Sequence, residues 1–126
     1  MPTILYTVRA TCPDLQTRGR YLAWLSPNHI MEVIKGGAAG ARIILPLPDD
    51  RSGQTPAGQQ AGTARPTPTD AAPAICETHY TFPSRKAFDD YVRLHAPALR
   101  ADGLKHFPPD SGITFTRQVA EIAAEL

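Results

Sequence analysis

Two histidines occupy corresponding places in two similar passages of the sequence. Each lies close to a proline in a stretch of helical pattern: His29 follows Pro27, and His95 precedes Pro97. Imidazole is the side chain most easily poised for proton transfer near neutral pH. The sequence therefore predicts His95 as the first candidate for a catalytic residue and His29 as the second. The alternative is that both are core residues whose rings bond to the backbone where a helix bends.

Six further side chains are candidates for binding a small organic ligand. Tyrosine and tryptophan offer an apolar ring with a polar end, and arginine can hold a carboxylate through two parallel hydrogen bonds. The candidates are Tyr6, Trp24, Tyr80, Tyr91, Arg42 and Arg100. Each has a simpler alternative, because tyrosines also fill cores, and arginines at strand and helix ends more often meet solvent or an internal acid.

The sequence contains no motif for a metal or a cofactor. No pair of histidines has HxxxH or HxH spacing, and Cys12 and Cys76 form no CxxC pair. We therefore expect no metal, no cofactor and two buried thiols. If the strands that carry Cys12 and Cys76 pair antiparallel, the thiols lie close together without a bond in a reducing cytosol.

The composition is that of one soluble globular domain. The chain has 126 residues, of which 42% are hydrophobic and 20% charged, and its formal net charge is +1. Acids and bases are interspersed, which argues against nucleic acid and against a membrane surface as partners. No apolar segment approaches the ~20 residues that span a bilayer, and the N-terminus begins with a strand pattern. We expect a cytoplasmic protein.

Hydrophobic periodicity predicts a first strand-helix-strand unit. Residues 3–10 alternate as a strand, and residues 41–46 form a second strand. The helix between them should begin at Pro13. Its predicted apolar stripe consists of Leu15, Leu22 and Leu25. Ser26 and Pro27 suit the start of a new short helix that ends at Gly36, so a break is expected just before His29.

A second unit of the same kind follows. Residues 75–82 form the strand, with Cys76, Thr78, Tyr80 and Phe82 on one face. Ser84 is the predicted N-cap of the next helix. The predicted buried stripe of that helix is Phe88, Tyr91, Val92, His95 and Leu99. A last strand is expected at 112–117, and a short amphipathic helix at 118–126.

Residues 49–74 separate the two units. The segment contains no Val, Ile, Leu, Met, Phe, Tyr, Trp or Cys. It has nothing to bury and cannot offset the entropy lost on ordering its backbone, so we expect a flexible Pro/Gly-rich insertion in a single domain that spans 1–126. A functional lid is the alternative.

The order of elements predicts an α+β fold of the ferredoxin-like βαββαβ type. In this fold a four-stranded antiparallel sheet carries two bent helices on one face. The other face is then open, and Leu5, Ile44 and Ile75 are predicted to point to it. A mixed apolar sheet face favours a second copy over solvent, so we expect a homodimer.

At these residues the chain resembles an uncharacterised small bacterial family of the dimeric α+β-barrel superfamily. The matching features are Trp24-Leu25, His29-Ile30 with Val33, the 37–42 run, Tyr80 with Phe82, Tyr91, the run His95-Ala-Pro-Ala-Leu-Arg100, and Phe107. The resemblance covers nearly the whole chain except the insertion. It implies a ferredoxin-like fold and a homodimer whose sheets pack face to face. The superfamily also includes cofactor-independent monooxygenases, muconolactone-isomerase-like enzymes, haem-handling proteins and stress proteins.

The sequence supports three functional hypotheses. The first is a homodimeric protein that binds a small organic ligand in a pocket between helices and sheet. The second is a cofactor-independent monooxygenase or isomerase that acts on a small aromatic or enolisable compound. The third is a non-catalytic interaction module whose core is filled and whose histidines bond to backbone.

Overall fold

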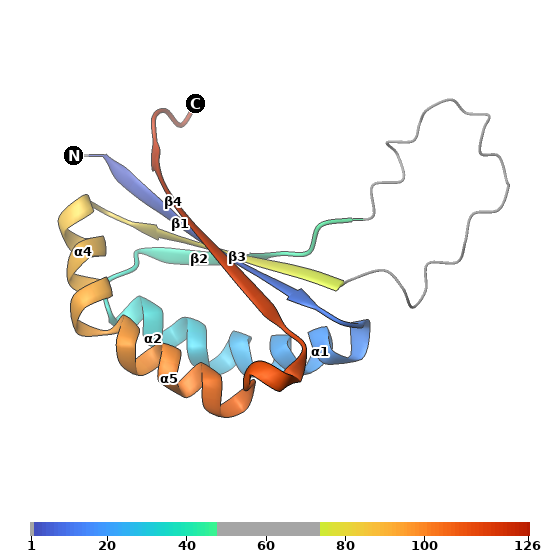
Figure 1. The fold of residues 1–126 in the computed structure, drawn as a ribbon. Helices are drawn as coiled ribbons and strands as arrows, with labels where there is room; N and C mark the ends of the chain where they lie inside the picture. The colour runs from blue at the N-terminus through green and yellow to red at the C-terminus, as the bar shows by residue number, and fades with distance from the viewer. Residues whose placement is uncertain (1, 48–73) are drawn as a thin grey trace, which may run out of the picture.

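The computed structural model describes residues 2–47 and 74–126. Four strands form one antiparallel sheet in the order β2-β3-β1-β4, and the helices of the described part cover one face of it (Figure 1). The elements are β1 (Thr3–Cys12), α1 (Leu15–Trp24), η1 (Leu25–His29), α2 (Ile30–Lys35), β2 (Gly40–Ile44), β3 (Ala74–Phe82), α4 (Arg85–Leu94), α5 (Ala96–His106), η3 (Pro109–Ser111) and β4 (Thr114–Ile122). The predicted βαββαβ ferredoxin-like arrangement is confirmed.

The central pair of strands, β1 and β3, supplies the floor of the core. Their register places Tyr6 opposite Tyr80 and Ile4 opposite Phe82. Every second residue of β3 is buried, because a strand turns alternate side chains to opposite faces. The predicted helix-facing sides of both strands are therefore confirmed. Helices α1 and α4 both contact this pair of strands.

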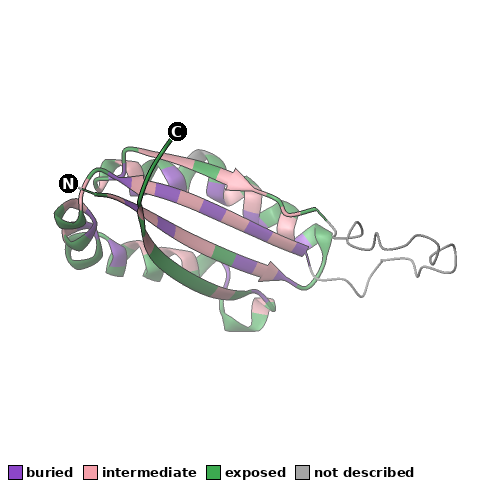
Figure 2. Cartoon of the chain, turned by 90° about the horizontal axis from the view of Figure 1, so that it is seen from above, coloured by how far each residue is buried: buried purple, intermediate pink, exposed green. Residues whose placement is uncertain are grey.

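The opposite face of the sheet carries no helix, and Figure 2 shows it towards the viewer. Leu5, Ile44 and Ile75 lie on it as predicted, and all three are only partly buried. Ile43 alternates with Ile44 and packs against the core, opposite Thr78. The sheet thus has one face in the core and one face of mixed polarity that no helix of residues 2–47 and 74–126 covers.

The first helix differs in its stripe from the prediction. Asp14, rather than a residue before Pro13, caps α1: its side chain accepts a hydrogen bond of 2.7 Å from the Thr17 amide. Leu15 is 68% exposed, so it was wrongly assigned to the core. The buried positions are Thr17, Tyr21 and Leu25, which recur every fourth residue.

The predicted new start at Ser26 is also wrong. The helix continues through η1 as a π-helical turn, in which the Ile30 amide bonds to the Leu25 carbonyl, and no side chain caps it. Proline in a helix has no amide to donate and clashes with the carbonyl four residues earlier. A wider turn at Pro27 lets the chain continue into α2 and rotates the residues that follow it.

The end of the chain is a strand, so the helix predicted at 118–126 is wrong. β4 runs to Ile122 and pairs with β1 from Thr3↔Ile122 to Thr11↔Thr114. The spacing of Val119 and Ile122 fits a helix locally, but the free edge of β1 offers a full ladder of backbone hydrogen bonds. The predicted insertion at 49–74 lies outside the described residues, except that Ala74 is the buried first residue of β3.

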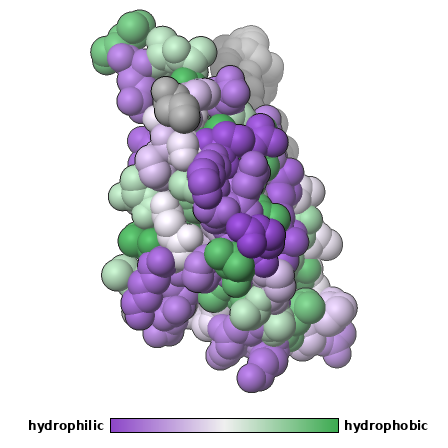
Figure 3. All heavy atoms as spheres, turned by 90° about the vertical axis from the view of Figure 1, so that its left-hand side faces the viewer, coloured by the Kyte–Doolittle hydropathy of each residue, from purple (hydrophilic) through white to green (hydrophobic). Residues whose placement is uncertain are grey.

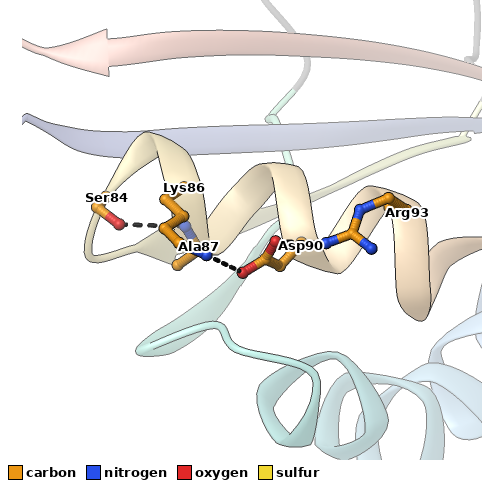
Figure 4. A network of polar contacts seen from close by, with 5 residues as sticks. All are labelled: Ser84, Lys86, Ala87, Asp90 and Arg93. Carbon is orange, nitrogen blue, oxygen red and sulfur yellow. Dashed lines mark hydrogen bonds and ion pairs between the residues drawn. The ribbon is translucent and has the colours of Figure 1, made fainter.

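Helix α4 begins as predicted at Ser84, whose hydroxyl accepts a hydrogen bond of 3.1 Å from the Ala87 amide (Figure 4). Its outer face carries ion pairs from Asp90 to Lys86 at 3.0 Å and to Arg93 at 2.9 Å. Figure 3 shows that hydrophilic side chains dominate the end of the molecule from which α4 projects. The N-cap and the packing of its apolar side against the sheet thus stabilise the helix, and its charged side chains face solvent.

We expect Ser84→Ala to lower the free energy of unfolding by about 1 kcal/mol, because the Ala87 amide loses its acceptor. Lys86→Ala is the matched comparison on the same helix. It removes only an exposed ion pair, so it should change stability by about 0.5 kcal/mol or less. Urea unfolding followed by circular dichroism measures both values. An equal effect of the two substitutions would contradict the importance of the cap.

Candidate ligand pocket between helices and sheet

A cavity of about 290 Å³ lies between the helical layer and the sheet. Its walls come from β1, β3, β4, α1, η1, α4 and α5. The lining residues are Tyr6, Val8, Tyr21, Trp24, His29, Tyr80, Tyr91, Leu99, Arg100, Gly103, Leu104, Phe107, Phe115 and Arg117. Most of them are aromatic or aliphatic, which is typical of a site for a small organic molecule.

Three tyrosines form one wall. The pairing of β1 with β3 brings the rings of Tyr6 and Tyr80 to a centroid distance of 6.0 Å. Tyr91 reaches in from α4, with its ring 6.2 Å from that of Tyr6. None of the three hydroxyl groups has a hydrogen-bond partner among the residues that the structure describes. They are therefore available to a ligand.

A second aromatic group closes the other side. The Tyr21 ring lies 5.6 Å from Phe107 and 5.9 Å from Phe115. Trp24 lies 5.8 Å from Tyr21 and also packs edge-on against Phe107 at 5.6 Å. These rings come from α1, β4 and the residue that follows α5, so the cavity forms only when the two halves of the chain pack together.

Burial favours the protonated form of Tyr21, Tyr80 and Tyr91. It raises the pKa of Tyr91 to about 12 and raises the pKa values of Tyr21 and Tyr80 further still. At neutral pH these side chains are neutral phenols that can donate one hydrogen bond each. They can orient a ligand but cannot act as bases.

His29 is the cavity-lining residue whose ordinary pKa lies nearest to neutral pH. Its ring stacks on Trp24 at 4.6 Å, and its buried Nδ1 atom has no hydrogen-bond partner among residues 2–47 and 74–126. Burial lowers the pKa of His29, and the Asp102 carboxylate opposes this shift only in part. The imidazole is therefore neutral near pH 7 and can exchange a hydrogen bond or a proton with a ligand.

Two arginines line the cavity where it meets solvent. Arg100 comes from α5 and Arg117 from β4, and both side chains are exposed. Arg117 points to the helical side of the sheet because its neighbour across the ladder is Val8, which packs against the core. Its guanidinium lies 5.9 Å above the Phe115 ring.

The structure brings most of the predicted site residues together. The predicted residues that line the cavity are His29, Tyr6, Trp24, Tyr80, Tyr91 and Arg100. Arg42 does not line the cavity, because it lies opposite His79 on the open face of the sheet. Strand alternation turns it away from the helices.

The prediction that His95 is buried and faces the sheet is wrong. His95 is exposed and does not line the cavity. It follows the last residue of α4 with a φ of −118°, and α5 starts anew at Ala96. A Cβ placed on Gly36 would lie 3.0 Å from its ring, so the imidazole rests on the end of α2 outside the core. Val92, at 37% exposed, also leaves the predicted stripe.

Sequence reasoning missed several lining residues, among them Tyr21, Phe107, Phe115 and Arg117. Tyr21 lies four residues before Leu25, a helical spacing that points to the same face. Phe115 and Arg117 alternate on β4 and so share a face of the strand. These two spacings were the available signals.

No three His, Cys, Asp or Glu side chains within 2–47 and 74–126 come close enough to hold a metal ion. Cys12 and Cys76 are both buried free thiols, and burial raises the pKa of Cys76 to about 11. Cys76 pairs with Ala10, so Cys12 is its diagonal neighbour, at roughly 7–8 Å between Cα atoms and too far for a relaxed disulfide. No helix in the described ranges is long and apolar enough to cross a membrane.

No protein-family model and no curated protein matches the sequence. Solved structures do match. A dimeric ferredoxin-like protein from an uncultured marine organism has a TM-score of 0.60 at 10% identity, over 100% of both chains. A proposed antibiotic biosynthesis monooxygenase from Bacillus cereus has a TM-score of 0.59 at 11% identity, over 100% of this chain and 98% of that one.

An EthD-like protein from Ralstonia eutropha has a TM-score of 0.57 at 16% identity, with 100% of this chain and 96% of that chain covered. At these identities the likeness concerns the fold. It agrees with the strand order and the one-sided helical layer described above. The chain has the α+β, ferredoxin-like fold.

We expect His29 to make stability depend on pH. Its pKa in the folded protein is lowered from 6.5, so the unfolded chain takes up a proton more readily. Above pH 6.5 the imidazole is neutral in both states, so His29 does not make the free energy of unfolding depend on pH. As the pH falls below that value, the unfolded chain is protonated first and the folded state loses stability. In His29→Gln this part of the decline should disappear. Urea unfolding of both proteins between pH 5 and pH 8 gives the comparison, and parallel profiles would contradict the burial of a neutral imidazole.

Proposed function

We propose that the protein is a homodimer that binds a small, mainly apolar organic molecule in the cavity between its helices and its sheet. The observation that carries the proposal is an aromatic-lined space of about 290 Å³ that contains an unpartnered, buried Nδ1 atom of His29. A filled core with both histidines bonded to backbone would have favoured an interaction module instead.

The size of the cavity supports a ligand of one or two rings. Drug-sized ligand sites begin at about 300 Å³, so this cavity is at the small end. Aromatic walls stack on flat ligands, and the tyrosine hydroxyls and His29 offer a few polar contacts that fix orientation. Each buried polar group left without a partner costs free energy, which a ligand with matching groups would recover.

The open face of the sheet supports the homodimer. It carries the partly buried Leu5, Ile44 and Ile75 together with a polar group in which Glu77 pairs with Arg9 at 3.5 Å and with His79 at 3.0 Å. The Nδ1 atom of His79 is buried and lacks a hydrogen-bond partner. A two-fold axis through this face would bring the same apolar patch of each copy together. The marine protein of the same fold is described as dimeric.

Filling the cavity should abolish ligand binding. Gly103 lines it, and a Cβ added there would lie 3.5 Å from Trp24, in ordinary contact. Gly103→Leu should therefore extend into the space and block it, while the α5 backbone is kept. The probe is 3-phenylpropanamide, a neutral one-ring compound, titrated against the emission of Trp24, the only tryptophan in the chain.

Gly103→Ala is the matched control. It adds only the Cβ and should raise the free energy of unfolding by roughly 0.5–1 kcal/mol, because alanine is the better helix former, and it should still bind. Unchanged affinity in Gly103→Leu would refute a ligand site in this cavity.

Charging the open sheet face should separate the dimer. Light scattering of the parent is expected to give about twice the chain mass of 13.7 kDa. Leu5→Glu would bury a carboxylate between the sheets, at a cost that a dimer interface cannot offset, so a monomer is expected. Leu15→Glu, at an exposed position on α1, makes the same change outside the face and should remain dimeric. A monomeric parent would overturn the homodimer.

A further inference from the structure

We propose that the ligand of this cavity is a monocarboxylic acid with an apolar or aromatic body, and that its carboxylate lies between Arg100 and Arg117. This inference rests on the proposed function, because it names the chemical class of the molecule that the cavity binds. The observation that carries it is that two arginines from separate elements line the same aromatic cavity.

The two arginines lack internal acids. Three of the other described arginines pair with a carboxylate: Arg9 with Glu77, Arg85 with Asp89, and Arg93 with Asp90. Neither Arg100 nor Arg117 has such a partner within 2–47 and 74–126. Two guanidinium groups that line one cavity repel each other, and an anion bound between them would offset that repulsion.

Both arginines act on the same interior group. Each lowers the pKa of Tyr91, against the larger effect of burial, so both charges lie within electrostatic reach of this wall of the cavity. Arg117 is held over the Phe115 ring, which limits how far its side chain can move away. Arg100 lies on α5, so the helix fixes the position of its backbone.

No acidic residue of the described ranges lines the cavity. Its lining includes two cations and neither Asp nor Glu. Asp102 is the acid with the largest influence on His29, but it is not a lining residue, and it lies 3.9 Å from the exposed His106. The potential at the open end is therefore positive, and an anion is favoured there.

The remaining walls define the rest of the ligand. Beyond the arginines the cavity is bounded by aromatic rings, by Leu99 and by Val8, with the neutral His29 and tyrosine hydroxyls as the polar groups. The part of the ligand that fills this space must be mainly apolar. It can carry at most one acceptor or hydroxyl group for each polar side chain that it contacts. A planar carboxylate matches the fork of a guanidinium, so one acidic group at the open end completes the fit.

The test compares two probes of the same shape. 3-Phenylpropanoate carries the charge, and 3-phenylpropanamide replaces it with a neutral amide. We expect the parent to bind the carboxylate at least tenfold more tightly than the amide, as measured by the emission of Trp24 and by calorimetry. The preference should shrink at high salt, since part of it is electrostatic.

Arg100→Gln and Arg117→Gln should each reduce the carboxylate preference severalfold, and the double variant should remove it while the affinity for the amide is kept. Lys105→Gln is the matched control: it removes one positive charge from α5 at an exposed residue that does not line the cavity. It should retain the parent preference. Circular dichroism confirms that the variants are folded.

The two proposals fail in different ways. If neither probe binds, or if binding survives Gly103→Leu, the cavity is not a ligand site and the proposed function fails together with this inference. If both probes bind equally and Gly103→Leu blocks both, the cavity binds ligands but the carboxylate inference is overturned. A preference that persists in the double arginine variant overturns it as well.

Discussion

The pairing of β1 with β3 is the constraint on which the rest of the structure depends. Nine residue pairs, from Ile4↔Phe82 to Cys12↔Ala74, fix which side chains face the helices. A slip of one residue would turn Tyr6 or Tyr80 to the open face and dismantle both the core and the cavity wall. The two strands belong to different halves of the chain, so this single ladder also joins the two strand-helix-strand units into one domain.

The π-helical turn is the second determinant of the site. Pro27 cannot continue a regular helix, and the widened turn places His29 against Trp24 with its Nδ1 atom inside the protein. In the second unit Pro97 produces a different result. There the helix stops and restarts, and His95 is left outside the core. Two similar sequence passages therefore give one histidine inside the cavity and one on the surface, because the backbone responds to proline in two ways.

The sequence predicted the parts of the fold that repeat with a strict period. Alternation along β1 and β3 identified their buried faces, and Ser84 identified the start of α4. It failed where a period was carried across a proline, as for His95, whose helical phase ends at the break. It also failed for β4, since Val119 and Ile122 satisfy a helical spacing, and only the free edge of β1 makes the strand the better choice.

The two buried cysteines allow the opening of the core to be measured. Both thiols lie on the helix-facing side of the central strands, and burial raises the pKa of each, so neither is reactive while the helices cover the sheet. A thiol reagent can reach them only when the helical layer separates from the sheet. The rate at which the native protein is labelled therefore reports how often its interior opens, without any engineered reporter group.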